Sequence, residues 1–386
     1  MLLNSYEVVT LGDVCHFVGG GTPARDQPEF YSGDIPWATV KDFKSSTIID
    51  TKEHVTQEAV DRSASNIVEP GTVLLVTRVG LGKVAMAGHR LAINQDIKGL
   101  TPRGGVLPEY LFWFLVGAAP TIERMGVGAT VKGVTLQDVK SIKMPLPKEA
   151  DQRRIVDLLS RAENIIQMRQ AAEQKAKEII PALFLDMFGD PGTNPMGWEV
   201  ARIEDCCTLV RGSSPRPQGD PRYFCGPVPR LMIADITRDG IYVTPRIDSL
   251  TPVGAERSRP MNCGDVVMAV SGACGLPAIL AVDACIHDGF VGFRSLSERI
   301  RAEYLYTFLA VIREETEKQA VGATFQNLKT DQIRAWKVPI PPIRIQDSFV
   351  ERAKSLRRLG DDMARASRYS ESVFQSLLAR MFGEAE

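Results

Sequence analysis

The sequence predicts an α+β protein with two tandem, similar α/β domains. Two long helices separate these domains and run antiparallel as an intramolecular coiled coil, which gives the chain approximate two-fold symmetry. Two observations predict this fold class. The 386-residue chain repeats nearly its whole length, at an offset of about 193 residues. Each copy also ends in a long stretch with apolar residues at heptad spacing.

Short motifs that recur in the same order carry the repeat. So many ordered matches are very improbable by chance, and they predict a duplicated domain. We place the first domain in residues 1–147, the first long helix in 148–190 with a linker to 198, the second domain in 199–341 and the second long helix in 342–386. The matched motifs are Val18–Pro23 with Val210–Pro215, Ile35–Trp37 with Val228–Arg230, Pro70–Leu74 with Cys263–Val267, Val127–Thr130 with Val321–Thr324, and Lys143–Pro147 with Lys337–Pro341.

Each domain mixes short strands with a few helices. Val73–Val76 and Val266–Ala269 are continuous apolar runs after a glycine turn, which predicts buried strands. The glycines of Gly80–Gly82 predict a loop with unusual backbone angles. Tyr110–Val116 and Tyr304–Val311 are expected to be helical.

The stretch Asp151–Phe188 predicts one long helix, entered through a Pro-x-Pro motif. Its heptad seam is apolar apart from Arg169 and therefore needs a partner. The short linker requires the second helix to return antiparallel, although each helix could instead pack only on its own globular neighbour. The seam positions are Ile155, Ala162, Arg169, Ala176 and Leu183 with Leu158, Ile165, Ala172 and Ile179, and in the second copy Phe349, Leu356, Met363 and Leu377 with Leu359, Ala366 and Val373.

Composition limits the classes of partner and cellular compartment. Charge gives no support for a polyanionic partner, since 46 Lys and Arg face 47 Asp and Glu. Seven cysteines, none in a Cys-x-x-Cys pair, and four scattered histidines predict a reduced, cytoplasmic protein without a metal site. The N-terminal segment lacks a basic region before an apolar run, so we expect no secretory signal. The most apolar window, Tyr110–Ala119, is too short to cross a bilayer.

No complete catalytic motif is found in the sequence. Gly80–Val84 is similar to a phosphate-binding loop, but Thr77 stands where that motif needs glycine. Asp42 and Asp235 are the only convincing acids shared by both copies within a motif, which is too few for metal-dependent hydrolysis. Two alternatives stay open: a duplicated-domain nuclease or hydrolase with an unrecognised site, and an adaptor whose domains bind protein.

The ordered motifs resemble those of the specificity subunit of type I restriction-modification systems over essentially the whole chain. Each copy has a glycine-containing loop before Pro23 or Pro215, and then a short strand with Trp37 or Arg230. Each copy continues through Pro-x-Pro into a long helix that closes with Met-Phe-Gly. The linker Phe188–Trp198 is also similar to that family. The exchange of Trp37 for Arg230 affects the expected loop shape of the second copy but not its architecture.

The resemblance implies a non-catalytic subunit that gives DNA sequence specificity to a type I restriction enzyme and adenine methyltransferase complex, a phage-defence system. Each domain would be a target recognition domain for one half of a bipartite, asymmetric site in double-stranded DNA. The helices would set the unread spacer and dock two modification (methyltransferase) subunits, which restriction/translocase subunits would join. No cofactor is expected in this chain, because S-adenosylmethionine, ATP and magnesium would be bound by the partner subunits.

Base reading requires hydrogen-bonding side chains on exposed loops. We expect such side chains beside Trp37, around Gly80–Gly82 and after the Val-Gly-Ala-Thr motifs, with solvated surface charge as the alternative for each. Trp37 itself is expected in the core, and Gly20, Gly128, Gly212 and Gly322 are expected to serve backbone shape. The candidate DNA-binding residues are Thr39, Lys41, Arg78, Lys83 and Lys132 in the first domain and Arg211, Arg216, Arg230 and Gln326 in the second.

Overall fold

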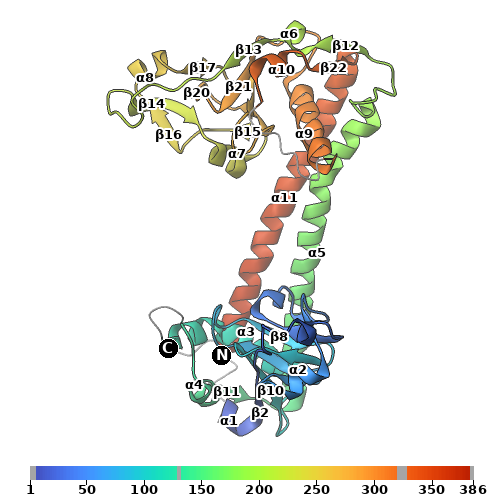
Figure 1. Cartoon of the computed structure of the whole chain (residues 1–386), viewed down its shortest axis with the longest axis vertical. Helices are drawn as coiled ribbons and strands as arrows, with labels where there is room; N and C mark the ends of the chain where they lie inside the picture. The colour runs from blue at the N-terminus through green and yellow to red at the C-terminus, as the bar shows by residue number, and fades with distance from the viewer. Residues whose placement is uncertain (1–5, 128–131, 320–327, 383–386) are drawn as a thin grey trace. The chain divides into compact units, whose positions relative to one another are not determined.

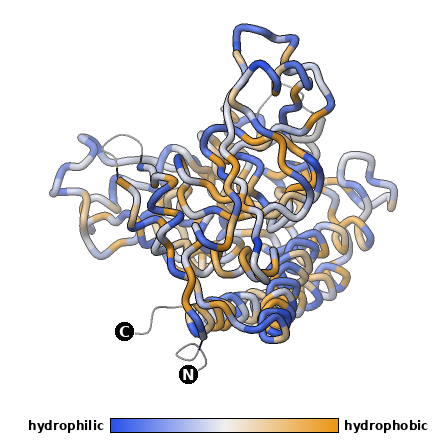
Figure 2. Tube along the Cα trace, turned by 90° about the horizontal axis from the view of Figure 1, so that it is seen from below, coloured by the Kyte–Doolittle hydropathy of each residue, from blue (hydrophilic) through white to orange (hydrophobic). Residues whose placement is uncertain are grey.

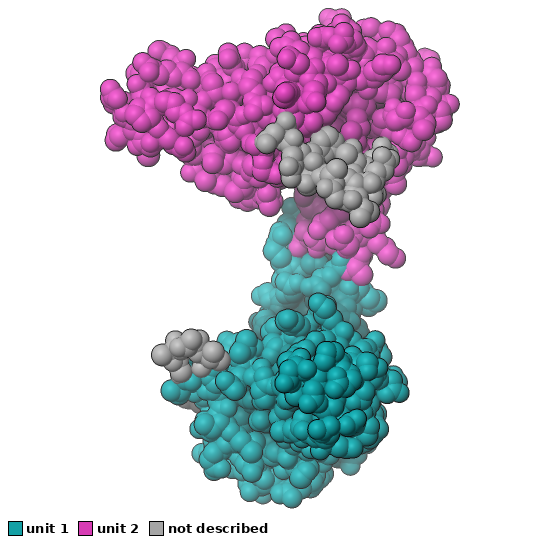
Figure 3. Space-filling model, in the orientation of Figure 1, with its two compact units in different colours: residues 1–170, 365–386 teal, residues 171–364 magenta. Residues whose placement is uncertain are grey.

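The computed structural model describes residues 6–127, 132–319 and 328–382, and it divides the chain into two compact units (Figures 1 and 3). Unit 1 contains residues 1–170 and 365–386, and unit 2 contains residues 171–364. Each unit combines one globular part with a portion of both long helices. The units therefore do not follow the sequential order of domain, helix, domain, helix, because each helix contributes residues to the packing of both units.

The globular part of unit 1 contains sheets with the strand orders β1-β11, β2-β10-β7-β8-β4 and β5-β3-β9-β6. Helix α3 packs beside the second of these sheets, with contacts to β7, β8 and β10. The elements are β1 (Glu7–Thr10), α1 (Leu11–Val14), β2 (Cys15–Gly19), η1 (Pro28–Tyr31), β3 (Ile35–Ala38), η2 (Val40–Asp42), β4 (Thr47–Ile48), β5 (His54–Val55), α2 (Gln57–Asp61), β6 (Asn66–Val68), β7 (Val73–Val76), β8 (Val84–Ala87), β9 (Leu91–Ile93), β10 (Ile97–Pro102), α3 (Pro108–Met125), α4 (Leu136–Ser141) and β11 (Lys143–Leu146).

The globular part of unit 2 repeats this plan strand for strand. Its sheets have the orders β12-β22, β13-β21-β18-β19-β15 and β16-β14-β20-β17. Helix α9 takes the place of α3, with contacts to β18 and β19. The elements are β12 (Glu199–Arg202), α6 (Ile203–Cys206), β13 (Thr208–Arg211), β14 (Phe224–Leu231), α7 (Ile233–Asp239), β15 (Tyr242–Val243), β16 (Asp248–Leu250), α8 (Pro252–Glu256), β17 (Arg259–Met261), β18 (Val266–Ala269), β19 (Pro277–Leu280), β20 (Ala284–Ile286), β21 (Phe290–Arg294), α9 (Ala302–Gln319), α10 (Thr330–Arg334) and β22 (Lys337–Ile340).

The matching strand orders confirm the predicted duplication of an α/β domain. The predicted strands Val73–Val76 and Val266–Ala269 are β7 and β18, and each is buried along its whole length. Hydrophobic segments, orange in Figure 2, run through the chain among hydrophilic ones. Both predicted helices are longer than expected. Helix α3 starts at Pro108 and ends at Met125, and α9 spans Ala302–Gln319.

The two long helices, α5 (Glu149–Phe188) and α11 (Ile343–Phe382), pair in antiparallel fashion within each unit. In unit 1, Arg169 Nη1 donates hydrogen bonds to the carbonyl of Ala366 and to Ser370 Oγ, each at 2.5 Å. Gln170 Nε2 donates to the Glu371 carboxylate at 3.0 Å. The single cation of the predicted seam is therefore satisfied by the facing helix.

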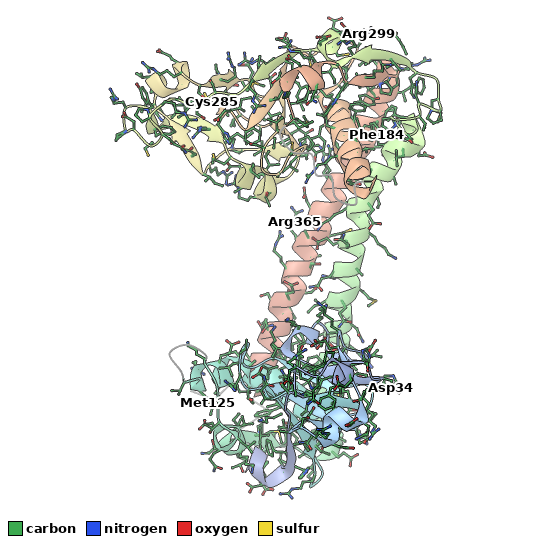
Figure 4. The ribbon with its side chains drawn as sticks, viewed as in Figure 1. Asp34, Met125, Phe184, Cys285, Arg299 and Arg365 are labelled. Carbon is green, nitrogen blue, oxygen red and sulfur yellow. The ribbon has the colours of Figure 1, made fainter. Side chains whose placement is uncertain are left out.

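In unit 2 the helix pair and the globular part share one aromatic cluster, near the label of Phe184 in Figure 4. Phe184 and Phe188 of α5 lie 5.7 and 5.4 Å, between ring centroids, from Phe349 of α11. Both also contact Tyr304 of α9, at 5.3 and 4.9 Å. Each helix thus packs on its partner helix and on a globular part, and the two alternatives considered from sequence are both realised.

The predicted seam is only partly buried. Ile155 of the first column is buried, but Leu158, Ile165 and Ile179 of the second column are 41–43% exposed. Leu359 of α11 is 54% exposed. The seam prediction was wrong on this point, because each helix also turns a face toward its globular part and cannot bury both heptad columns against the other helix.

A buried glutamine joins each long helix to its globular part. Gln152 Oε1 accepts from the N–H of Leu107 at 2.9 Å, and its Nε2 donates to the carbonyls of Gly105 and Pro147, each at 2.9 Å. Gln346 repeats this pattern in unit 2, where Nε2 donates to the carbonyls of Arg299 and Pro341 and Oε1 accepts from the N–H of Arg301. Both side chains are buried. The amide thus fixes the Pro-x-Pro entry and the start of α3 or α9 to the first turn of the long helix.

Two buried tyrosines reinforce the same joint. The Tyr110 hydroxyl donates to the carbonyl of Pro145 at 2.8 Å, and the Tyr304 hydroxyl donates to the carbonyl of Pro339 at 2.9 Å. Both rings are fully buried. Within the part of the chain that the structure describes, no helix has the length and apolar character needed to span a membrane.

We expect Gln152→Ala to destabilise unit 1 by about 2–3 kcal/mol, because it leaves a buried N–H and two carbonyls without their partner. Thermal and denaturant unfolding of the full chain would measure the loss. Gln137→Ala, at an exposed position of α4, is the matched control. Equal stability of the two variants would contradict the role assigned to the buried amide.

Candidate nucleic-acid interface

In each unit, two loops lie against one another through a glycine. In unit 1 the N–H of Gly21 donates to the carbonyl of Ile93 at 3.1 Å, and a Cβ at Gly20 would clash with the carbonyl of Asn94. In unit 2 the N–H of Ser213 donates to the carbonyl of Ile286 at 3.1 Å. The close approach confirms that Gly20 serves backbone shape.

The second copy has the same steric requirement at Gly212. A Cβ there would clash with the carbonyl of His287. The N–H of Gly212 donates to the carbonyl of Phe290 at 2.9 Å. We call residues 20–23 with 93–96, and residues 212–215 with 286–289, the paired loops of units 1 and 2.

A buried side chain supports the paired loops from the core. In unit 1 this is Trp37 of β3, 1% exposed, whose Nε1 donates to the carbonyl of Gly21 at 3.3 Å. In unit 2 it is Arg230 of β14, whose Nη2 donates to Ser214 Oγ at 2.8 Å. The core position predicted for Trp37 is confirmed. Arg230, the equivalent residue of unit 2, supports its loop in the same way with a charged group.

A hydroxyl of the glycine loop then holds a polar side chain of the facing loop. Thr22 Oγ1 donates to the amide oxygen of Gln95 in unit 1. Ser214 Oγ donates to Asp288 Oδ1 at 2.5 Å in unit 2. This hydrogen bond from Ser214 is the main cause that lowers the pKa of Asp288 below its ordinary value, so the carboxylate stays ionised at neutral pH.

The paired loops of unit 1 border a hollow of about 510 Å³ that gathers several predicted residues. Arg78 lies beside it, with its Nε 3.9 Å from an oxygen of Asp96, which lines the hollow. The wall carries charges of both signs and hydrogen-bonding groups, a mixture that suits base edges better than phosphate alone. Thr22, Trp37, Thr39, Lys41, Lys83 and Gln95 are among the lining residues.

An arginine that sequence reasoning did not select forms part of the same wall. The Arg25 guanidinium lies 4.4 Å from the ring centroid of Tyr31 and 5.0 Å from that of Trp37. It also forms a two-point ion pair with Glu53, at 2.7 and 3.0 Å. These contacts fix the guanidinium over the aromatic core, where it shapes the hollow.

Of the two candidates that follow the Val-Gly-Ala-Thr motifs, Lys132 lies within the described residues and Gln326 does not. Lys132 is exposed and follows the segment that is not described, next to the bridge between Gly133 and Arg78. It is therefore close to the Arg78 side of the hollow. Gln326 lies outside the described residues, as do Gly128 and Gly322.

Arg230 lies in strand β14 and not on an exposed loop, so this prediction was wrong. It is 4% exposed, and its Nη1 forms an ion pair with Asp248 Oδ2 at 2.6 Å. Its strand pairs with β20, where Cys285 is labelled in Figure 4. A strand position with the side chain turned inward explains the burial. This guanidinium is committed to the loop support and the ion pair, and it is not available for a base.

The other two predicted arginines of unit 2 are exposed. Arg216 lies 3.8 Å from Asp288 at its nearest, with a side chain that is 68% exposed. Arg211 is also exposed, and its Nη1 donates to the carbonyl of Leu328 at 3.5 Å. Arg216 therefore lies at the paired loops, while Arg211 lies at the end of β13, beside the loop that starts with Gly212.

The two shared acids have a structural role. Asp42 Oδ2 accepts from the N–H of Thr39 at 2.8 Å, and Asp235 Oδ2 accepts from the N–H of Met232 at 3.1 Å, so each caps a short helix. Their second oxygens accept from the N–H groups of Lys52 and Arg246. Among the residues that the structure describes, no cluster of His, Cys, Asp or Glu has the arrangement of a metal site.

Sequence reasoning missed Arg25, Gln95 and Asp288. Gln95 and Asp288 are equivalent under the repeat, so an alignment of the two copies would have placed them at the same position. Their neighbours differ, with Asn94 before Gln95 and His287 before Asp288. They therefore fall outside the motifs that revealed the duplication.

One loop surface, present twice with different polar side chains, defines a two-site recognition protein. Residues 4–178 and 195–363 match the family model of the type I restriction modification DNA specificity domain. The chain belongs to this family, and its role is that of a DNA specificity subunit. The nuclease and adaptor alternatives are not favoured.

Individual relatives agree with this assignment. The chain is 24% identical, over 369 residues, to the specificity subunit of the type I restriction enzyme MjaIX of Methanocaldococcus jannaschii, covering 89% of this chain and 85% of that protein. Its fold is similar to a chain from structural work on complex assembly and conformational transition of the type I R-M system, with TM-score 0.70, 20% identity and 99% of each chain covered. It is also similar to the type I restriction-modification S subunit of M. genitalium, with TM-score 0.55 and 12% identity, covering 100% of this chain and 99% of that one.

We expect Arg230→Ala to affect the stability of the protein and Arg216→Ala to affect its action on DNA. Arg230→Ala leaves Asp248 without its buried partner and should lower the stability by about 3 kcal/mol. Arg216→Ala should leave the unfolding midpoint unchanged but weaken methylation of cognate DNA by the assembled complex. Thermal unfolding and a methylation assay would separate the two effects. Loss of stability in Arg216→Ala would contradict the surface role assigned to Arg216. Unchanged stability in Arg230→Ala would contradict the structural role assigned to Arg230.

Proposed function

We propose that each globular part reads one half of a bipartite, asymmetric site in double-stranded DNA. The observation that carries this proposal is the pair of equivalent loop surfaces, which have the same backbone plan and different hydrogen-bonding side chains. Gln95 and Arg25 mark the surface of unit 1, and Asp288 and Arg216 mark that of unit 2. Different donors and acceptors on one scaffold suit two unlike half-sites.

The long helices set the length of the unread spacer between the half-sites. Support for this comes from the joint at Gln152 and Gln346, because a buried amide with three hydrogen bonds couples each globular part to the first turn of a long helix. A change of helix length is then transmitted to the recognition surface rather than absorbed by a flexible connection.

The helices also dock two modification subunits, which restriction/translocase subunits join. Support comes from the apolar side chains that the helix pair leaves in contact with water. In unit 1, Leu158, Ile165 and Met168 are exposed on α5, and Tyr369 is 72% exposed on α11. Leu158 and Ile165 are one heptad apart, the spacing at which a further helix packs.

Catalysis and cofactors belong to the partner subunits. The shared acids Asp42 and Asp235 are used as helix caps, which supports a non-catalytic role for this chain. We assign S-adenosylmethionine and the methylation of adenine to the modification subunits, and ATP and magnesium to the complex that includes the restriction subunits.

Mapping methylated adenines in DNA exposed to the assembled complex tests the central proposal, and we expect a split motif. Seven residues inserted after Gln170 together with seven after Ala364 should lengthen the paired helices by about 10 Å. The spacer should then grow by about three base pairs at 3.4 Å each, with both half-sites retained. Insertion in α5 alone is the control, because α11 is then not lengthened to match and the residues of α5 after Gln170 lose their register with α11. An unchanged spacer with the double insertion would contradict the proposal.

We expect the double variant Leu158→Ser, Ile165→Ser to fold normally but to bind modification subunits at least tenfold more weakly, because it removes exposed apolar contacts. Leu159→Ser, at the neighbouring buried position, is the contrast and should reduce stability instead. Analytical ultracentrifugation and thermal unfolding would measure the two effects. Wild-type assembly by the double variant would place the docking surface elsewhere.

A further inference from the structure

We propose that Gln95 and Asp288 are specificity-determining residues, each reading one base edge in its own half-site. The inference rests on the proposed reading of a bipartite site and adds the residues and the class of base. Gln95 suits adenine, and Asp288 suits a base with an exocyclic amino group in the major groove, cytosine above all.

The two residues occupy equivalent positions in the fold. Gln95 lies in the loop between β9 and β10, and Asp288 lies in the loop between β20 and β21. Each follows a strand that pairs in parallel with the strand of Trp37 or Arg230. Both side chains are exposed, that of Asp288 to 59%. The scaffold therefore presents one side chain to the outside at the same point of each recognition surface.

A chain of contacts from the core fixes the direction of each side chain. In unit 2, Asp248 holds Arg230, Arg230 holds Ser214, and Ser214 holds Asp288. In unit 1, Trp37 holds the loop of Gly21, and Thr22 of that loop holds the Gln95 amide. A side chain held in this way loses little freedom when it binds, which is what a base-reading group needs.

The hydrogen-bonding capacity left over decides which base each residue fits. The Gln95 amide uses one position of its oxygen for Thr22 and one N–H for Asp96, at 3.3 Å. A second lone pair and a second N–H remain, and this donor–acceptor pair complements the N6 and N7 edge of adenine. Asp288 is ionised and offers only acceptor positions, which complement the amino group of cytosine.

The charge of Asp288 argues against a general surface role. A carboxylate at a DNA-facing loop repels phosphates and weakens binding to any sequence that offers it no donor. Arg216 and His287 lie 3.8 and 3.9 Å from the Asp288 carboxylate. Burial, together with the Arg230 guanidinium, lowers the pKa of His287. The imidazole therefore gives little positive charge at neutral pH. The carboxylate therefore penalises wrong bases as well as accepting from the right one.

The test uses the chain assembled with its modification subunits, and it maps methylated adenines in a genome or a randomised DNA library. We expect Gln95→Ala to relax one base position of one half-site, with roughly tenfold to hundredfold lower discrimination. Asp288→Asn should relax or change one position of the other half-site by a similar factor. Each variant should leave the opposite half-site and the spacer unchanged, and Gln137→Ala should leave the whole motif unchanged.

The outcomes separate this inference from the function on which it rests. A wild-type complex that gives no split motif would overturn the proposed function. A wild-type split motif that both variants retain would overturn the inference alone. Weaker methylation of all sites without a change in base preference would also overturn it, because a residue that only stabilises the loops acts in this way.

Discussion

The joint between each globular part and its long helix is the interaction on which the structure depends. One buried glutamine accepts from a backbone N–H at the start of α3 or α9, and it donates to one carbonyl just before that helix and to the carbonyl of the last proline of the Pro-x-Pro entry. Apolar packing alone would tolerate sliding of a helix against a sheet. Three buried hydrogen bonds prevent such sliding, because each requires a particular geometry and each is costly to leave unmade.

The two recognition surfaces show how one backbone plan carries two chemistries. The glycines at 20 and 212 bring the paired loops into backbone contact, and this part of the plan is identical in both units. The group beneath the loops differs, an indole in one unit and a guanidinium with its carboxylate partner in the other. Either group satisfies the loop, so the support can change while the loop geometry is kept.

The long helices divide their surfaces among several tasks. Their ends enter the cores of the globular parts, where Phe184 and Phe188 of α5 and Phe349 of α11 meet Tyr304. Elsewhere Arg169 is satisfied by a carbonyl and a hydroxyl of the facing helix, although it breaks the apolar seam. Leucines and isoleucines with seam spacing are left half exposed. A helix that packs on a facing helix and on a globular part, and leaves a further face exposed, cannot be described by one heptad seam.

The sequence by itself determined the duplication, the strands β7 and β18 and the two long helices, because these follow from internal repetition and local periodicity. It also selected Thr39, Lys41 and Lys83 as candidates in two separate loops, which the structure brings to one hollow. Only the tertiary structure decided that Arg230 faces inward and that Gln95 and Asp288 are held at the surface. Those properties depend on contacts between segments distant in the chain, such as Ser214 with Asp288 and Arg230 with Asp248, which no local pattern encodes.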